Sequence, residues 1–170
     1  MNNNITNKKN ITLFFCDVYG TVDNGFTEEE CKEFSNLLEQ IIRHNGSDYL
    51  MFGMASTEDY LTVDDYEKKL TKYFEKNVKL LPKLPESKVL NEAKISFIIK
   101  YINFLLENYN IEEIYLADDS VFNQEMLRGL LFSLVGIELK SIIPPKNNNN
   151  LKFINTSINE ILVSNSHIRK

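Results

Sequence analysis

The chain has 170 residues, of which 43% are hydrophobic and 25% are charged, as is ordinary for a globular domain. Its net charge of −5 and pI of about 5.2 argue against a general nucleic-acid binder, which would carry a basic stripe. Two cysteines are too few for a disulfide framework, and no apolar run approaches the ~20 residues of a membrane span. We therefore expect a cytoplasmic protein with no nucleic-acid partner and no membrane span.

The apolar pattern predicts strands that alternate with helices along the whole chain. In chain order, the predicted elements are strand 11–17, helix 27–44, strand 49–55, helix 62–76, strand 78–81, helix 91–108, strand 114–117, helix 122–134, strand 139–143 and helix 157–166. Continuous apolar strands are typical of a parallel sheet that helices cover on both faces. The predicted fold class is therefore α/β, a three-layer sandwich with about five parallel strands.

Both ends of the chain and its asparagine content carry weaker signals. The polar residues 1–10 predict a disordered leader, so residues 11–170 form one predicted domain, with a loop at the asparagine run 147–150. The last residues do not resemble a natural stop, and we expect a further domain beyond the C-terminus. The asparagine bias is that of an AT-rich genome, and it is compatible with a bacterial effector secreted into a host cell.

Polar side chains follow three of the predicted strands, at the point where each strand ends. Asp17 ends the first strand, Ser56 and Thr57 follow the second, and Asp118 with Asp119 closes a later one. Because the carboxyl ends of parallel strands lie along one edge of a sheet, these residues are expected to converge where α/β sheets bind ligands. Each of these residues also has an alternative interpretation as a purely structural cap, because serines and carboxylates are common at turns and at the starts of helices.

In this order the motifs resemble the haloacid dehalogenase-like (HAD) hydrolase superfamily. The first motif of that family is an apolar strand followed by Asp-x-Asp-Gly-Thr, which here reads Asp17-Val18-Tyr19-Gly20-Thr21. The second is a strand that ends in Ser or Thr, here Ser56 or its rival Thr57. The third is a lysine that opens a helix, best matched by Lys94 with Lys88 as its rival, and the fourth is the pair Asp118-Asp119.

The resemblance implies a set of roles for these residues. Asp17 would be the nucleophile that forms an aspartyl-phosphate, Ser56 would hydrogen-bond a phosphoryl oxygen, and Lys94 would offset negative charge. Mg²⁺ would be held by Asp17, the carbonyl of Tyr19, Asp119 and the adjacent Asp118. The phosphate would also contact the loop residues of the first two motifs, which are Tyr19, Gly20, Thr21 and Thr57.

Tyr19 is the main departure from the family pattern. Phosphatases of this superfamily carry a second aspartate there as general acid and base, and loss of such help typically costs about 10²–10⁴ in rate. Three readings stay open: a phosphatase for substrates with a good leaving group, a binding module with weak or no catalysis, and a 2-haloacid dehalogenase. True dehalogenases do read Asp-x-Tyr-Gly-Thr, but they carry a cap and use no metal, whereas this chain retains an acidic pair.

The spacing of the motifs leaves no room for a cap domain. Between Asp17 and Ser56 there are 38 residues, and one predicted helix takes up most of them. Residues 57–94 contain one predicted helix and one short strand. An open site cannot enclose a small metabolite, so a large substrate is favoured. The expected substrate is a phosphorylated protein, with phosphotyrosine as the preferred residue because a phenol leaves without much protonation.

Overall fold

Five parallel strands form one sheet, in the order β3-β2-β1-β4-β5. The structure, a computed structural model, describes residues 7–18, 21–22, 27–55, 60–82, 94–145 and 150–168. The strands are β1 (Lys9–Cys16), β2 (Tyr49–Met54), β3 (Val78–Leu80), β4 (Tyr109–Ala117) and β5 (Leu139–Ile142). The first strand in the sequence is therefore the central one, and it pairs with β2 on one side and β4 on the other.

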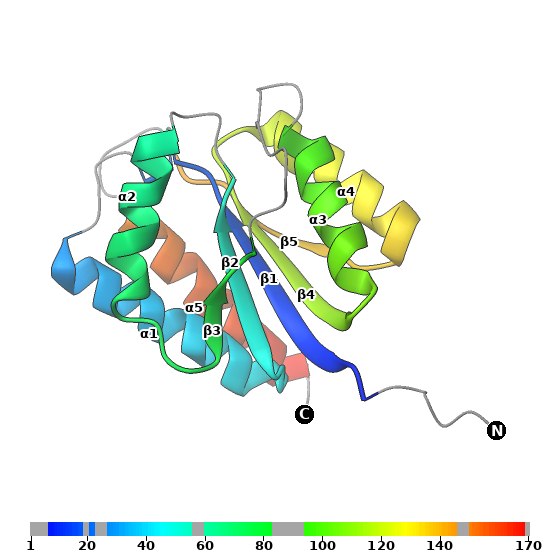
Figure 1. The fold of residues 1–170 in the computed structure, drawn as a ribbon, viewed down its shortest axis with the longest axis horizontal. Coiled ribbons are helices and arrows are strands. Elements are labelled where there is room, and N and C mark those ends of the chain that lie inside the picture. Colours follow the sequence, from blue (N-terminus) through cyan, green and yellow to red (C-terminus); the bar gives the residue numbers. More distant parts are fainter. Residues whose placement is uncertain are drawn as a thin grey trace.

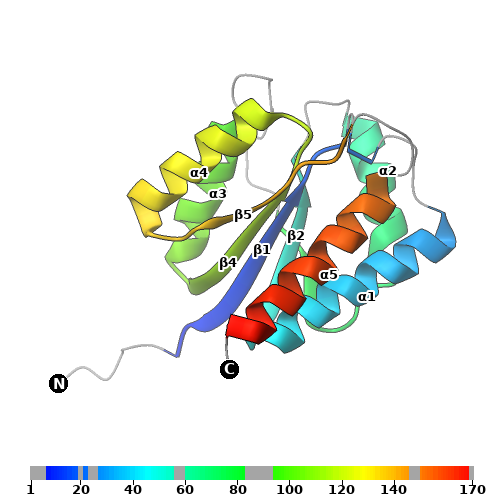
Figure 2. The same ribbon diagram turned by 180° about the vertical axis from the view of Figure 1, so that it is seen from behind.

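Helices cover both faces of this sheet (Figures 1 and 2). They are α1 (Glu28–Asn45), α2 (Tyr60–Thr71), α3 (Lys94–Leu106), α4 (Val121–Val135) and α5 (Asn150–Ile168). The helices α1, α2 and α5 lie on one face, and α3 and α4 lie on the other. The predicted three-layer α/β sandwich is confirmed. None of the helices in the described part of the chain combines the length and the apolar character needed to span a membrane.

The ends of α1 form as the sequence predicts. The Thr27 hydroxyl accepts a hydrogen bond from the Glu30 amide at 3.1 Å, and the Glu30 carboxylate accepts one from the Thr27 amide at 3.0 Å. These two bonds complete a capping box. At the other end, Gly46 adopts the left-handed region with φ 77°, and its amide donates to the Ile42 carbonyl at 2.8 Å. Local sequence therefore fixes the length of this helix.

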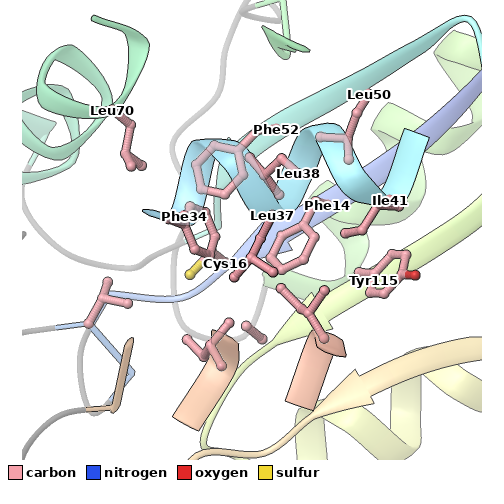
Figure 3. Packing of buried hydrophobic residues seen from close by; sticks show 14 of the residues in the cluster. Phe14, Cys16, Phe34, Leu37, Leu38, Ile41, Leu50, Phe52, Leu70 and Tyr115 are labelled. Atoms are coloured by element: carbon pink, nitrogen blue, oxygen red, sulfur yellow. The ribbon is translucent and has the colours of Figure 1, made fainter. Parts of the chain in front are cut away.

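Side chains alternate between the two faces of β1, and both sets are buried. Phe14 points toward α1, where it stacks on Tyr115 with ring centroids 5.4 Å apart and meets the edge of Phe34 at 5.7 Å (Figure 3). Leu13 and Phe15 belong to the second cluster, with α3 and α4. This burial on both faces explains the continuous apolar run of β1. Both cysteines are buried in the first cluster as free thiols.

The sheet is longer at its amino-terminal end than predicted. β1 begins at Lys9, so Lys9 and Asn10 belong to the sheet rather than to a disordered leader. β4 begins at Tyr109, five residues before the predicted start at residue 114. The extra residues alternate between exposed and half-buried and pair with the start of β1, so they lack the apolar run that marks the rest of the strand.

Two helices also differ from their predicted lengths. α5 begins at Asn150 rather than residue 157, because Leu151, Ile154 and Ile158 already form its buried stripe. The last asparagine of the run is therefore helical, and residues 147–149 lie outside the described residues. α2 ends at Thr71, five residues before the predicted end, where the chain turns toward β3. Neither difference changes the topology.

Candidate active site

Backbone hydrogen bonds hold the carboxyl ends of β1, β2 and β4 in register with one another. The Asp17 amide donates to the Ala117 carbonyl at 2.8 Å, and the Ala55 amide donates to the Cys16 carbonyl at 2.8 Å. Further along the edge, the Asp118 amide donates to the carbonyl of Ile142 at 3.1 Å. These bonds continue the parallel ladders past the last paired residues, so Asp17 and Asp118 leave the sheet side by side, as the strand-end argument predicts.

Lys94 joins the two carboxylates. Its ammonium nitrogen lies 2.9 Å from Asp17 Oδ1 and 2.7 Å from Asp118 Oδ2, and all three side chains are buried. The lysine occupies the first turn of α3, which starts at the same edge of the sheet. The rival Lys88 lies outside the described residues. A buried ammonium between two buried carboxylates is an arrangement that solvated surface lysines do not make.

The start of α4 orients Asp118. Its Oδ1 accepts from the Ser120 amide at 2.8 Å, and its Oδ2 accepts from the Asn123 side-chain amide at 3.3 Å as well as from Lys94. Ser120, rather than either aspartate, is the N-cap of α4, because its hydroxyl accepts from the Asn123 amide at 3.2 Å. The aspartate pair thus lies just outside the helix, with Asp118 facing inward and Asp119 half-buried.

Gln124 holds the loop that carries these aspartates. Its side-chain nitrogen donates to the carbonyls of Leu116, Asp118 and Ile142 at 2.9, 3.2 and 3.1 Å. Because all three partners are acceptors, the orientation of the amide is fixed. The residue is fully buried and links the ends of β4 and β5. We did not predict this role. The sequence does contain an indication of it, because Gln124 is a polar residue on the same buried side of α4 as Leu127 and Leu131.

Burial and neighbouring charges shift the ionisation of the cluster. Burial, reinforced by the nearby Asp118 carboxylate, raises the pKa of Asp17 to about 6 even though Lys94 acts in the opposite direction. Burial disfavours the ammonium form of Lys94, but Asp17 and Asp118 outweigh it and raise the lysine's pKa above its usual range. The lysine is therefore a permanent cation. Its single positive charge does not balance the negative charges of both Asp17 and Asp118.

The carboxylates fit a divalent metal ion. Asp17, Asp118 and Asp119 each offer an oxygen, and these three atoms lie within 4.8 Å of one another. Three carboxylates against one ammonium leave a net negative charge, and oxygen-only ligands are those that Mg²⁺ prefers. Among the described residues, this is the group with the composition of a metal site.

Of the five remaining predicted phosphate-contacting residues, the structure describes one. Thr21 is fully buried in the turn after β1, where its amide donates to the Val18 carbonyl at 3.1 Å. Its hydroxyl has no hydrogen-bond partner among the described residues. The other predicted phosphate-contacting positions, Tyr19, Gly20, Ser56 and Thr57, lie outside the described residues, and their roles stay predictions.

Comparisons with known proteins give a distant structural likeness. No protein-family model matches the chain, and no curated protein matches it. Among solved structures, it is similar to the HAD domain of the effector protein Lem4 from Legionella pneumophila, with 12% sequence identity and a TM-score of 0.49. The match covers 91% of this chain and 95% of that domain. At this identity and TM-score, the likeness assigns no role to any residue of the chain.

Proposed function

We propose that this chain is a Mg²⁺-dependent phosphohydrolase in which Asp17 is the nucleophile. The observation that carries the proposal is the buried bridge of Lys94 between Asp17 and Asp118 at the carboxyl edge of the sheet. A carboxylate held at that edge, beside a cation and two further carboxylates, has the parts needed for phosphoryl transfer through a covalent intermediate. Its pKa of about 6 leaves Asp17 mostly ionised at neutral pH.

The chemistry assigned to the residues has two displacements at phosphorus. In the first, an oxygen of Asp17 forms a bond to phosphorus while the bond to the leaving oxygen breaks and its electron pair departs with that oxygen. In the second, an oxygen of water forms a bond to the same phosphorus while the bond between phosphorus and Asp17 breaks and its electron pair returns to the carboxylate. Inorganic phosphate leaves with the protons of the water. Lys94 offsets the charge of the pentavalent transition state and keeps Asp17 in place.

A bound Mg²⁺ would supply neutralisation of the charge that carboxylates and phosphate bring together. Asp17, Asp118 and Asp119 are the described residues that would hold it. Asp118 is fully buried and paired with Lys94, whereas Asp119 is half-buried, so Asp119 is the better ligand for an ion that enters from solvent. The ordering agrees with the sequence-based assignment of Asp119 as the ligand of the fourth motif.

The proposed substrate is a phosphorylated protein, with phosphotyrosine favoured. Between β1 and β2 the described residues form α1, and between β2 and α3 they form α2 and β3, so no lid is found among them. A site without a lid suits a phosphate presented on a large surface. Tyr19, where phosphatases of the resembled family carry a second aspartate, favours a leaving group that needs no proton.

Tyr19 also supports a second candidate, a binding module that holds a phosphorylated partner without turning it over. The geometry of Asp17 and Lys94 serves both functions, because the same charges that stabilise a transition state also bind a phosphate. A third candidate is a 2-haloacid dehalogenase, whose first motif also has a tyrosine at the position of Tyr19. A dehalogenase uses no metal, so this candidate gives no role to the group of carboxylates formed by Asp17, Asp118 and Asp119.

Hydrolysis of para-nitrophenyl phosphate separates these candidates. We expect turnover with Mg²⁺ that is lost in EDTA and in the Asp17→Asn variant, while Asp48→Asn, at the exposed opposite end of the sheet, keeps full activity. Tyrosine and serine phosphopeptides then test the substrate. Equal rates for the wild type and Asp17→Asn, together with phosphopeptide binding, would support the binding module, and halide release from a 2-haloacid without metal would support the third reading.

A further inference from the structure

Asn123 is a second side chain that contacts the Asp118 carboxylate. Its side-chain nitrogen donates to Asp118 Oδ2 at 3.3 Å, and the same oxygen lies 2.7 Å from the Lys94 ammonium. Because only the nitrogen of an amide can donate to a carboxylate, this contact fixes the orientation of the Asn123 amide. The residue is half-buried in the first turn of α4, which begins beside the start of α3 at the carboxyl edge of the sheet (Figure 1). The amide therefore shares the Asp118 oxygen with the lysine.

The start of α4 does not need this side chain as a cap. Ser120 is the N-cap, and its hydroxyl accepts from the backbone amide of Asn123 at 3.2 Å. The next residue, Gln124, is fully buried and holds three carbonyls at the strand ends, so the backbone at position 123 is fixed on both sides. The helix dipole favours carboxylates in the first turn, so helix formation alone would favour an aspartate at position 123 over a neutral residue.

The charges around Asp118 explain why a neutral donor fits at this position. Lys94 lies 2.9 Å from Asp17 and 2.7 Å from Asp118, so one ammonium contacts two buried carboxylates. A buried carboxylate without other donors would pull the ammonium toward itself, because a buried charge without a partner is costly. The amides of Ser120 and Asn123 bring partial positive charge to Asp118 instead. More of the lysine's charge is then left for Asp17.

Other types of side chain at position 123 would upset this balance. A carboxylate of the same shape would place a like charge across the 3.3 Å that the hydrogen bond now spans, and it would compete for Lys94. A lysine or arginine would neutralise Asp118, but it would also add a positive charge beside the carboxylates that could hold a metal ion. An amide provides a donor without adding a net charge.

We propose that Asn123 is a positioning residue, whose amide holds the Asp118 carboxylate and thereby keeps the Lys94 ammonium shared with Asp17. Its effect on turnover rests on the proposed phosphohydrolase function, in which Lys94 stabilises the negative charge that develops when Asp17 attacks phosphorus. Its effect on the three buried charges is present without substrate and without metal. Asn123 acts through Asp118 and Lys94, and it is assigned no contact with the substrate.

Urea unfolding in EDTA at pH 8 tests the placement of Asp118 by itself. Because Asn123→Asp replaces the donor by a like charge, it should raise the equilibrium constant of unfolding about tenfold, and more than Asn123→Ala does. At an ordinary first-turn position the same aspartate would leave this constant unchanged or lower it, since the helix dipole favours the carboxylate. Gln40→Glu is the matched control, because it changes a half-buried helical amide on α1 into a carboxylate, and its effect should be less than about threefold.

Hydrolysis of para-nitrophenyl phosphate with saturating Mg²⁺ tests the consequence for catalysis. At a temperature where all variants are folded, we expect Asn123→Ala and Asn123→Asp to lower kcat about 10–100-fold with little change in KM, and Gln40→Glu to leave kcat unchanged.

Two results would overturn the proposal. One is full kcat in both Asn123 variants, and the other is an Asn123→Asp variant that is as stable as the wild type in EDTA, or more stable. An inactive wild type would overturn the phosphohydrolase function instead, and the unfolding measurements in EDTA would still decide whether Asn123 holds Asp118.

Discussion

Lys94 places its ammonium nitrogen 2.9 Å from Asp17 Oδ1, although the two residues come from α3 and from the end of β1. The ion pair is buried, and the same nitrogen is 2.7 Å from Asp118. Two carboxylates share one cation, so the fold holds an excess of negative charge in a site that water reaches poorly. The excess has consequences for stability as well as for chemistry.

The first consequence is a gain of stability when the charge of Asp17 is removed. The pKa of Asp17 rises from 3.8 to about 6 on folding, so the folded protein binds more protons than the unfolded chain between these values. Its stability therefore falls as pH rises from about 4 to 6, and the penalty persists above that range. In EDTA at pH 8, we expect Asp17→Asn to increase the free energy of unfolding by about 1–3 kcal/mol.

Urea unfolding of both proteins across pH measures this effect. The gain should shrink below pH 6 and vanish only below about pH 3, where Asp17 is protonated in the folded and unfolded states. Glu160→Gln removes an exposed carboxylate on α5 and should show no such dependence. If Asp17→Asn is less stable than the wild type at pH 8, the Lys94 ion pair outweighs the cost of burial.

The second consequence is stabilisation by Mg²⁺, which would offset the same excess charge. We expect Mg²⁺ to raise the melting temperature of the wild type, by an amount equivalent to about 2.7 kcal/mol at a hundredfold excess over Kd. Asp119→Asn should weaken binding at least tenfold in isothermal titration calorimetry, and Glu160→Gln should leave it unchanged. Equal affinity for the wild type and Asp119→Asn would remove Asp119 from the metal site.

The fold follows closely from the sequence, because its signals are local. The apolar runs of β1, β2 and β4 and the capping box at Thr27 depend on neighbouring residues only. The start of β4 was misplaced because its first residues pair with β1 at a half-exposed end, where no apolar run develops. The start of α5 was misplaced because asparagines before Leu151 read as a loop.

The site follows from the sequence only in part. Asp17 and Asp118 could be brought together by the rule that parallel strands end at one edge, and the structure does so. The choice of Lys94 needs the orientation of α3, which a sequence pattern does not contain. The role of Gln124 was missed because its three acceptors come from β4, the following loop and β5, and only the folded sheet makes them neighbours.

Gln124 gives the third prediction. Gln124→Met keeps the volume but removes the donor from three carbonyls at the ends of β4 and β5. The Ile142 carbonyl keeps the Asp118 amide as a donor, and the unpaired Oε1 of Gln124 is lost as well. Since a typical hydrogen bond contributes about 0.5–1.5 kcal/mol net, we expect a net loss of about 1–2 kcal/mol in urea unfolding. Gln40→Met on α1 is the control, with an expected change within about 0.5 kcal/mol.

The same variant separates positioning from simple stability. Because Gln124 holds the Asp118 carbonyl, Gln124→Met should also weaken Mg²⁺ binding under conditions where the protein stays folded. Unchanged calorimetric affinity, with stability alone reduced, would mean that Gln124 supports the fold without placing the aspartates.

Tyr19 gives the last prediction, which rests on the first motif because the residue lies outside the described part of the chain. Tyr19→Asp supplies the carboxylate that can protonate a leaving alkoxide. General acid help of this kind is worth about 10²–10⁴ in rate. We expect that gain in kcat/KM with serine phosphopeptides, whose leaving group needs a proton, and a change of less than about tenfold with aryl phosphates, whose phenol leaves without one.

Steady-state kinetics with both substrates measure the difference, and the double variant with Asp17→Asn should be inactive toward both. A similar gain on the two substrates would show that Tyr19 limits the first displacement in some other way, and no gain on serine phosphate would remove the reason for favouring phosphotyrosine.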